Sequence, residues 1–333
     1  MNQNDYGWFE RNYPKFVRHQ TKSGWRYFRP ISGYNSGQIR IEPAPPGVLM
    51  IDFTRRSGPE TVGSDPANPS YADILRWHSW FDWRERYEDI VLVFWTKSPQ
   101  KVMSIYRPMI EYLQSQGVTF LMFVTRNGYY YPIEPYVTPQ DQQLQEAVNV
   151  LGHTAIRYRF DPIIVGTQPD GSRIPNQDHW KQLIEEAEMY GITRIVINFL
   201  VPHYKGAGNK LSVMDYSVYE PEIDEKRDIL GEMLDVTPQH ITLQGCAESY
   251  MFKDDFPGRI LPAACTDPTW AMEVNPKLKD RQFHGSSSRS GKGIQCGCMY
   301  YSDLGIYENM GSDPCERGCV FCYAQSNPPI YGD

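Results

Sequence analysis

Six strand-length apolar segments, separated by segments with helical periodicity, constrain the fold of this 333-residue chain more than any other feature. They are rich in β-branched and aromatic residues, and most are almost continuously apolar, as expected of strands covered on both faces. The six segments are 48–54, 90–96, 119–125, 155–160, 194–200 and 240–246. Amphipathic helices are predicted between them at 100–116, 177–190 and 222–235, and we expect the first of these to begin or kink at Pro108.

Strands that alternate with helices predict an α/β fold with a parallel sheet and right-handed crossovers. Six β/α units are fewer than the eight that close a complete barrel. Two architectures are therefore compatible with the pattern, a partial (β/α)6 barrel and an open doubly wound sheet. In both, ligands bind at the carboxyl ends of the strands.

Polar side chains follow the predicted strands at those carboxyl ends. In the fourth strand, Arg157, Arg159 and Asp161 lie at alternate positions and therefore share one face. Two roles are open for Arg159 and Asp161: binding a ligand, or pairing with each other to brace the loop. Further candidates at the ends of the second, fifth and sixth strands are Lys97, Asn198 and Glu248.

The most distinctive motif lies near the C-terminus, in C-E-R-G-C-V-F-C-Y-A at 315–324. Cys315, Cys319 and Cys322 are spaced C-x-x-x-C-x-x-C, so one short loop can direct three thiolates at a common centre. Three thiolates hold three irons of a four-iron, four-sulfur cluster and leave the fourth iron open to a substrate or cosubstrate. A zinc knuckle with a fourth ligand and structural disulfides are the alternatives, although zinc motifs favour paired C-x-x-C units.

This run resembles the cluster-binding motif of the radical S-adenosylmethionine (radical SAM) superfamily. The resemblance implies a [4Fe-4S] cluster on the three cysteines, S-adenosyl-L-methionine bound to the open iron through its amino and carboxylate groups, and Phe321 near its adenine. From their positions at strand ends, we expect Lys97 and Arg159 to bind the carboxylate of S-adenosylmethionine by charge-assisted hydrogen bonds. We expect Asn198 or Glu248 to hold its ribose.

The resemblance also implies a fold and a reaction. It favours the partial barrel, with a tail that folds back to deliver the cluster, since only eleven residues follow Cys322. It implies that S-adenosylmethionine is cleaved reductively, with an electron donor such as flavodoxin or ferredoxin, to give a 5′-deoxyadenosyl radical that abstracts hydrogen from the substrate. Lyase, isomerase and transferase reactions all remain open. Two alternatives from other functional classes are a zinc-stabilised nucleic-acid-binding protein without catalysis and an iron–sulfur electron carrier.

A closer resemblance extends from residue 54 to residue 324. It is to a little-characterised family of bacterial and phage proteins that hold a radical-SAM-like cysteine cluster at the C-terminus. Besides 315–324, the matching segments are T-R-R at 54–56, F-W-T-K-S-P at 94–99, R-F-D-P-I at 159–163, G-C-A-E at 245–248, C-T-D at 265–267, Q-C-G-C at 295–298 and D-L-G-I-Y at 303–307. The chain departs from this family at 57–59, where Ser-Gly-Pro replaces the usual Thr-Asp-Ile-Pro, and at 308–313, where it has extra residues. More distantly it resembles the spore photoproduct lyase group, which acts on DNA thymines.

The four remaining cysteines predict a second metal site. Cys246 ends the sixth strand and Cys265 follows nineteen residues later. Cys296 and Cys298 form C-G-C, in which Gly297 lets both thiolates converge. Four cysteines suffice for a tetrahedral zinc or an auxiliary iron–sulfur cluster. The alternative is that Cys246 and Cys265 are buried apolar thiols.

Residues 1–47 are predicted to form an arm or cap outside the barrel. Between Asn2 and Arg40, seven Lys or Arg residues alternate with aromatic residues, against only two acidic ones, and P-A-P-P-G at 43–47 has the composition of a linker. Basic residues among aromatics suit phosphate contacts and base stacking, so we expect the arm to bind nucleic acid, with DNA, a nucleotide or a modified nucleobase as candidate substrate. The alternative is a cap that packs on the barrel. The expected organisation is thus an arm at 1–47, a partial barrel at 48–262 and a cysteine-rich cluster-binding segment at 263–333.

Hydropathy, the N-terminal sequence and the net charge indicate the expected cellular location and the kinds of binding partner. No apolar run approaches the roughly 20 residues of a membrane span. The N-terminus lacks the basic and apolar regions of a signal peptide, so we expect a cytoplasmic protein, with no membrane partner, whose thiols are reduced and available to iron. The net charge of −7 argues against a wholly basic nucleic-acid binder but is compatible with a local basic patch.

Overall fold

A computed structural model gives the fold of most of the central part of the chain. It describes residues 17–21, 24–28, 39–40, 47–53, 89–129, 131–134, 137–140, 142–174, 176–203, 207–245, 252–264, 266–283, 302–303 and 319–321. Of the predicted ligands, Cys246, Glu248, Cys265, Cys296, Cys298, Cys315 and Cys322 lie outside these residues.

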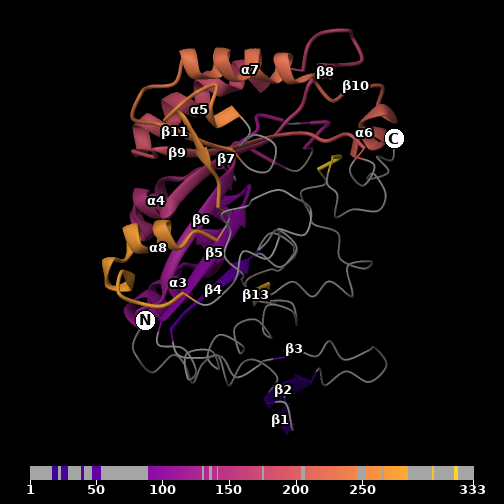
Figure 1. The fold of residues 1–333 in the computed structure, drawn as a ribbon. Helices are drawn as coiled ribbons and strands as arrows, with labels where there is room; N and C mark the ends of the chain where they lie inside the picture. Colours follow the sequence, from indigo (N-terminus) through magenta and orange to yellow (C-terminus); the bar gives the residue numbers. More distant parts are fainter. Residues whose placement is uncertain are drawn as a thin grey trace.

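The core is an eight-stranded sheet in which every neighbouring pair is parallel. Its strand order is β12-β11-β9-β7-β6-β5-β4-β13, and the sheet curls into half a barrel (Figure 1). The six central strands are those predicted: β4 (Val48–Phe53), β5 (Asp89–Thr96), β6 (Thr119–Thr125), β7 (Ile156–Ile163), β9 (Arg194–Phe199) and β11 (Thr242–Gly245). The short edge strands β12 (Ile260–Pro262) and β13 (Ser302–Asp303) were not predicted. The parallel partial barrel is therefore confirmed over the described residues.

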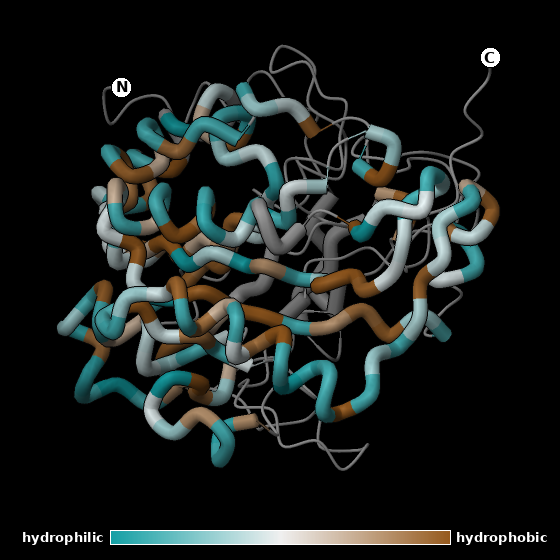
Figure 2. The backbone as a smooth tube through the Cα atoms, turned by 90° about the horizontal axis from the view of Figure 1, so that it is seen from above, coloured by the Kyte–Doolittle hydropathy of each residue, from teal (hydrophilic) through white to brown (hydrophobic). Residues whose placement is uncertain are grey.

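Four helices cover the outer face of the sheet: α3 (Pro99–Ser115), α4 (Gln145–Leu151), α5 (Asn176–Tyr190) and α7 (Ile223–Asp235). Hydrophobic and hydrophilic residues alternate along the helical turns (Figure 2). The buried apolar residues of these helices form one cluster with alternate residues of the strands. Of the two alternatives given for Pro108, a helix that begins there was wrong, since α3 runs through this proline. Helix α3 begins at Pro99, where a proline in the first turn costs no hydrogen bond, and its early turns bury Val102 and Met103.

The opposite, inner face of the sheet is plugged near the amino ends of the strands by a segment from late in the chain. There α8 (Pro268–Val274) and the 3-10 helix η5 (Pro276–Leu278) pack with inward residues of β4, β5 and β6. Trp270 of α8 lies 4.9 Å from Phe123 between ring centroids, and its indole N–H donates to the carbonyl of Thr154 at 2.7 Å. The plug covers the amino half of the inner face. The polar residues described below lie on the carboxyl half.

Smaller elements complete the described structure. A three-stranded antiparallel sheet lies within 1–47 and has the order β1 (Val17–Thr21), β2 (Gly24–Phe28), β3 (Ile39–Arg40). The strands β8 (Gly166–Thr167) and β10 (Ser217–Val218) pair with each other, and α6 (Ala207–Ser212) and the 3-10 helix η2 (His153–Ala155) fill connections. No helix in the part of the chain described above has the length and apolar character needed to cross a membrane.

Candidate functional site

The carboxyl ends of three adjacent strands bring a lysine, an asparagine and an arginine onto the inner face. Lys97 follows β5 in alternation with inward-facing Val93 and Trp95, and Asn127 follows β6 in the same way. Arg159 lies in β7 directly opposite Thr125 of β6. The sequence-level expectation that polar residues gather at this edge is thus met by the backbone register.

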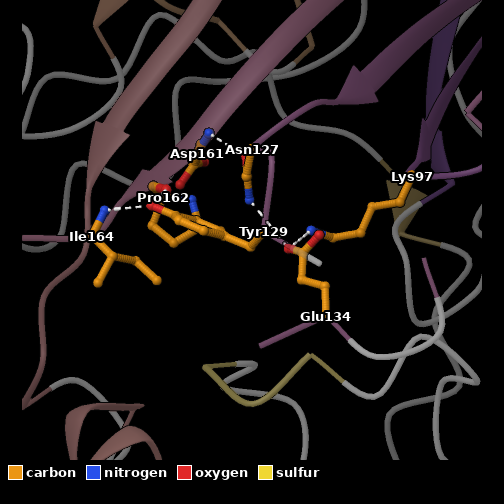
Figure 3. Close-up of polar contacts among 7 residues, drawn as sticks. All are labelled: Lys97, Asn127, Tyr129, Glu134, Asp161, Pro162 and Ile164. Carbon is orange, nitrogen blue, oxygen red and sulfur yellow. Dashed lines mark hydrogen bonds and ion pairs between the residues drawn. The ribbon is translucent and has the colours of Figure 1, made fainter. Parts of the chain in front are cut away.

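A continuous polar network joins these three residues. The Lys97 ammonium pairs with the Glu134 carboxylate, and both side chains are 2% exposed or less. The Asn127 amide donates to Glu134 Oε1 at 3.4 Å, and its oxygen accepts from the Asp161 backbone N–H at 3.0 Å. The Asp161 carboxylate in turn pairs with the guanidinium of Arg159. Figure 3 shows that Asn127 lies between Glu134 and Asp161.

Tyr129 connects the loop that follows β6 to the carboxyl end of β7. Its hydroxyl donates to the carbonyl of Pro162 at 3.2 Å and accepts from the backbone N–H of Ile164 at 2.8 Å (Figure 3). The side chain is 2% exposed, so both groups would be left buried and unpaired without it. These two hydrogen bonds hold together the segments against which residues 319–321 pack.

Residues 319–321 of the tail dock onto this edge of the half-barrel. The Val320 N–H donates to the Ile133 carbonyl at 3.0 Å. Cys319 and Phe321 are each 5% exposed and belong to an apolar cluster with Tyr129, Ile133 and Ile164. The Phe321 ring lies edge-on to Tyr129 at 6.0 Å, and Lys97 Nζ lies 5.3 Å from its centroid. Residues 319–321 therefore lie at the carboxyl ends of β5 and β6.

Residues 83–324 match a protein family described as a domain of unknown function, DUF1848. The chain belongs to this family. A search of curated proteins found no match. The DUF1848 region begins just before β5, contains the strands whose ends form the polar network, and ends with the cysteine run at 315–324. All strands of the half-barrel except β4, and the cysteine run at 315–324, thus lie within the region that matches this family, and the match leaves their chemistry undefined.

Within the DUF1848 region, Lys97 and Phe321 are brought together, and Arg159 is joined to them through the polar network. Arg159 pairs with Asp161, which is one of the two roles considered for it in the sequence analysis. Asn198 is half-buried on β9, beside β7. Among the residues that the structure describes, no group of three or more His, Cys, Asp or Glu is placed to hold a metal ion. The predicted roles of Cys315, Cys322, Glu248 and the second group of cysteines remain predictions.

Two residues at this site, one in the polar network and one beside it, were not predicted from the sequence. Glu134 and Tyr129 lie in the connection after β6, where neither shows any periodic or motif signal. Glu134 meets Lys97 across 37 residues of sequence. The one sequence signal for Glu134 is its position soon after a predicted strand, since ligands bind at the carboxyl ends of parallel strands.

Deeper on the inner face, two arginines stack on tryptophans. The Arg159 guanidinium lies 4.3 Å from the centroid of Trp95. The Arg157 guanidinium lies 4.1 Å from that of Trp270 and bonds Asp267 at 2.9 Å. Burial lowers the pKa of Arg157 to about 10, although Asp267 acts in the opposite direction, so Arg157 remains charged at neutral pH. Asp267 therefore offsets part of the cost of burying the Arg157 cation.

Proposed function

We propose that this DUF1848 protein is a radical SAM enzyme whose [4Fe-4S] cluster is held by Cys315, Cys319 and Cys322. The observation that carries the proposal is the docking of Cys319 and Phe321 at the carboxyl ends of the parallel strands, beside Lys97. Ligands of parallel β/α folds bind at this edge, so a cofactor on the tail would face the interior of the half-barrel.

The described residues suit such a cofactor. Thiolate sulfur is the preferred ligand of iron–sulfur clusters, and Cys319 lies in an apolar cluster that limits access of water. The Val320 bond to Ile133 fixes the middle of the cysteine run, which lowers the entropy that the loop loses on binding. When bound, the cluster supplies one electron to S-adenosylmethionine and so generates the radical that abstracts hydrogen from the substrate.

The chain's own residues would bind, orient and shield the cosubstrate. Phe321 presents a ring for the adenine, as the resemblance to radical SAM proteins implies. Lys97 suits the carboxylate better than Arg159 does, because Lys97 is the cation that lies against Phe321. Asn198 and Glu248 remain candidates for the ribose, and the basic arm at 1–47 remains a candidate for binding nucleic acid.

Replacing Lys97 separates its structural role from its proposed binding role. Lys97→Met should lower the free energy of unfolding by about 3–5 kcal/mol, because it leaves the Glu134 carboxylate buried without its cation. Adding Glu134→Gln removes that charge and should restore most of the melting temperature. The double variant should nevertheless bind S-adenosylmethionine at least about tenfold more weakly, since a hydrogen bond to a charged group contributes roughly 1.5–3 kcal/mol. Binding by the double variant at the wild-type affinity would assign Lys97 a structural role alone.

The proposed function is tested by anaerobic reconstitution of the full chain with iron and sulfide. Addition of a reductant and S-adenosylmethionine should then release 5′-deoxyadenosine.

A further inference from the structure

Several polar atoms on the inner face are buried without hydrogen-bond partners among the described residues. Nε and Nη2 of Arg157 lie next to the α8 plug, and three others are Nε of Arg159, Nε1 of Trp95 and Oε1 of Gln244. Gln244 is 5% exposed, and the Arg159 side chain 12%. A buried donor or acceptor without a partner costs about 1–3 kcal/mol, so three of them in one region need an explanation.

The strand register places the three atoms around one part of the face. Arg159 of β7 is opposite Val196 of β9, and Val196 is opposite Gln244 of β11, so all three residues lie in one row. Two strand spacings separate the ends of this row, roughly 10 Å between Cα atoms. Trp95 stacks on Arg159, with the guanidinium carbon 4.3 Å from the centroid of the indole ring. Apolar Val196 lies between the two polar ends.

The charges already present decide what kind of ligand fits. The Arg159 cation is paired with Asp161, and the next inward arginine, Arg157, with Asp267. A ligand that added an anion would therefore bring an uncompensated charge into a buried site, at a cost of several kcal/mol. The donors left over on Arg159 and Trp95 instead match a neutral oxygen, and Gln244 Oε1 matches an N–H or O–H.

We propose that Arg159, Trp95 and Gln244 form a binding subsite for an uncharged, amide-type planar group. Its carbonyl oxygen would accept from Arg159 and Trp95, and its N–H would donate to Gln244. A flat group suits the subsite, because the Trp95 and Phe123 rings lie 4.6 Å apart at its side. This inference rests on the proposed function in one respect: the group would belong to the substrate on which the enzyme acts.

Thermal unfolding with two matched probes tests the subsite without any turnover. Uracil carries carbonyl and N–H groups on a neutral ring, and orotate is the same ring with a carboxylate. At millimolar concentration, uracil should raise the melting temperature of the full chain by a few degrees, whereas orotate should not. Gln244→Met removes the acceptor, and Trp95→Phe removes the indole donor. Each should abolish most of the uracil shift at the same concentration.

The contrary outcomes are equally definite. A larger shift with orotate than with uracil would show an anion site, and no shift with either probe would make the three atoms structural. A uracil shift that persists in both variants would place the ligand elsewhere. Because the readout is melting temperature, these failures would leave the release of 5′-deoxyadenosine, and with it the proposed function, unaffected. Conversely, a chain that releases no 5′-deoxyadenosine can still show the shift.

Discussion

Cys319→Ala is expected to abolish both cluster assembly and the cleavage of S-adenosylmethionine. The side chain is buried at the edge where Lys97 and Tyr129 meet the tail, so no other group can take its place there without rearrangement. Loss of one of three thiolates leaves too few ligands to keep a four-iron cluster with a single open iron. Iron and sulfide per chain, visible absorption and 5′-deoxyadenosine should all fall to background.

The neighbouring residue supplies a matched control for this variant. Val320 is fully buried in the same apolar cluster, so Val320→Ala loses comparable packing but keeps every thiolate. It should cost roughly 1–2 kcal/mol of stability while retaining iron and cleavage. Cys315→Ala and Cys322→Ala should behave like Cys319→Ala. Full cleavage by any of the three cysteine variants would rule out the proposed ligand set.

Breaking the Arg157–Asp267 pair is expected to cause a large loss of stability. The two side chains are 1% and 12% exposed, and the pair fixes the α8 plug to β7. Removing one partner leaves a buried charge uncompensated, so Arg157→Ala should lower the free energy of unfolding by about 3–5 kcal/mol. Denaturant unfolding measures this directly. The exposed pair of Arg107 and Glu111 is the control, because Arg107→Ala there should cost no more than about 0.5 kcal/mol.

Asp267 also allows the charge to be separated from the helix cap. Its Oδ1 accepts from the Thr269 N–H at 2.9 Å, which caps α8, while Oδ2 bonds Arg157. Asn is an effective capping residue, so Asp267→Asn should keep the cap and lose the charge. Asp267→Ala loses both and should be less stable by about a further 1 kcal/mol. A loss below 1 kcal/mol in Arg157→Ala would mean that the pair does not hold the plug.

The central strands were predictable because burial on both faces leaves a continuous apolar signal in the sequence. The edge strands β12 and β13 are three and two residues long, too short for any period to show. The helix predicted over 100–116 agrees with α3, but the alternative that it begins at Pro108 gave too little weight to the residues before that proline. Burial of Val102 and Met103 offsets the hydrogen bond that an internal proline removes, so tertiary packing decided the boundary.

Part of the candidate site could be predicted because strand ends converge in parallel folds. Lys97, Arg159 and Phe321 were identified from position or motif, and the structure places them in one region. The pairing of Arg159 with Asp161 was one of the roles considered. The partners of Lys97 and Arg157 were not identifiable, because Glu134 and Asp267 meet these cations only through tertiary contacts, across 37 and 110 residues. The plug formed by α8 and η5 was likewise invisible, since nothing in a short amphipathic helix shows which surface it will cover.

The most direct test of the central claim is the release of 5′-deoxyadenosine by the reconstituted wild-type chain. Anaerobic protein carrying about four irons in its first cluster should form 5′-deoxyadenosine on addition of dithionite and S-adenosylmethionine, and the Cys319→Ala variant should form none. Wild-type protein that holds iron and sulfide but forms no more 5′-deoxyadenosine than Cys319→Ala would contradict the claim that this DUF1848 chain is a radical SAM enzyme.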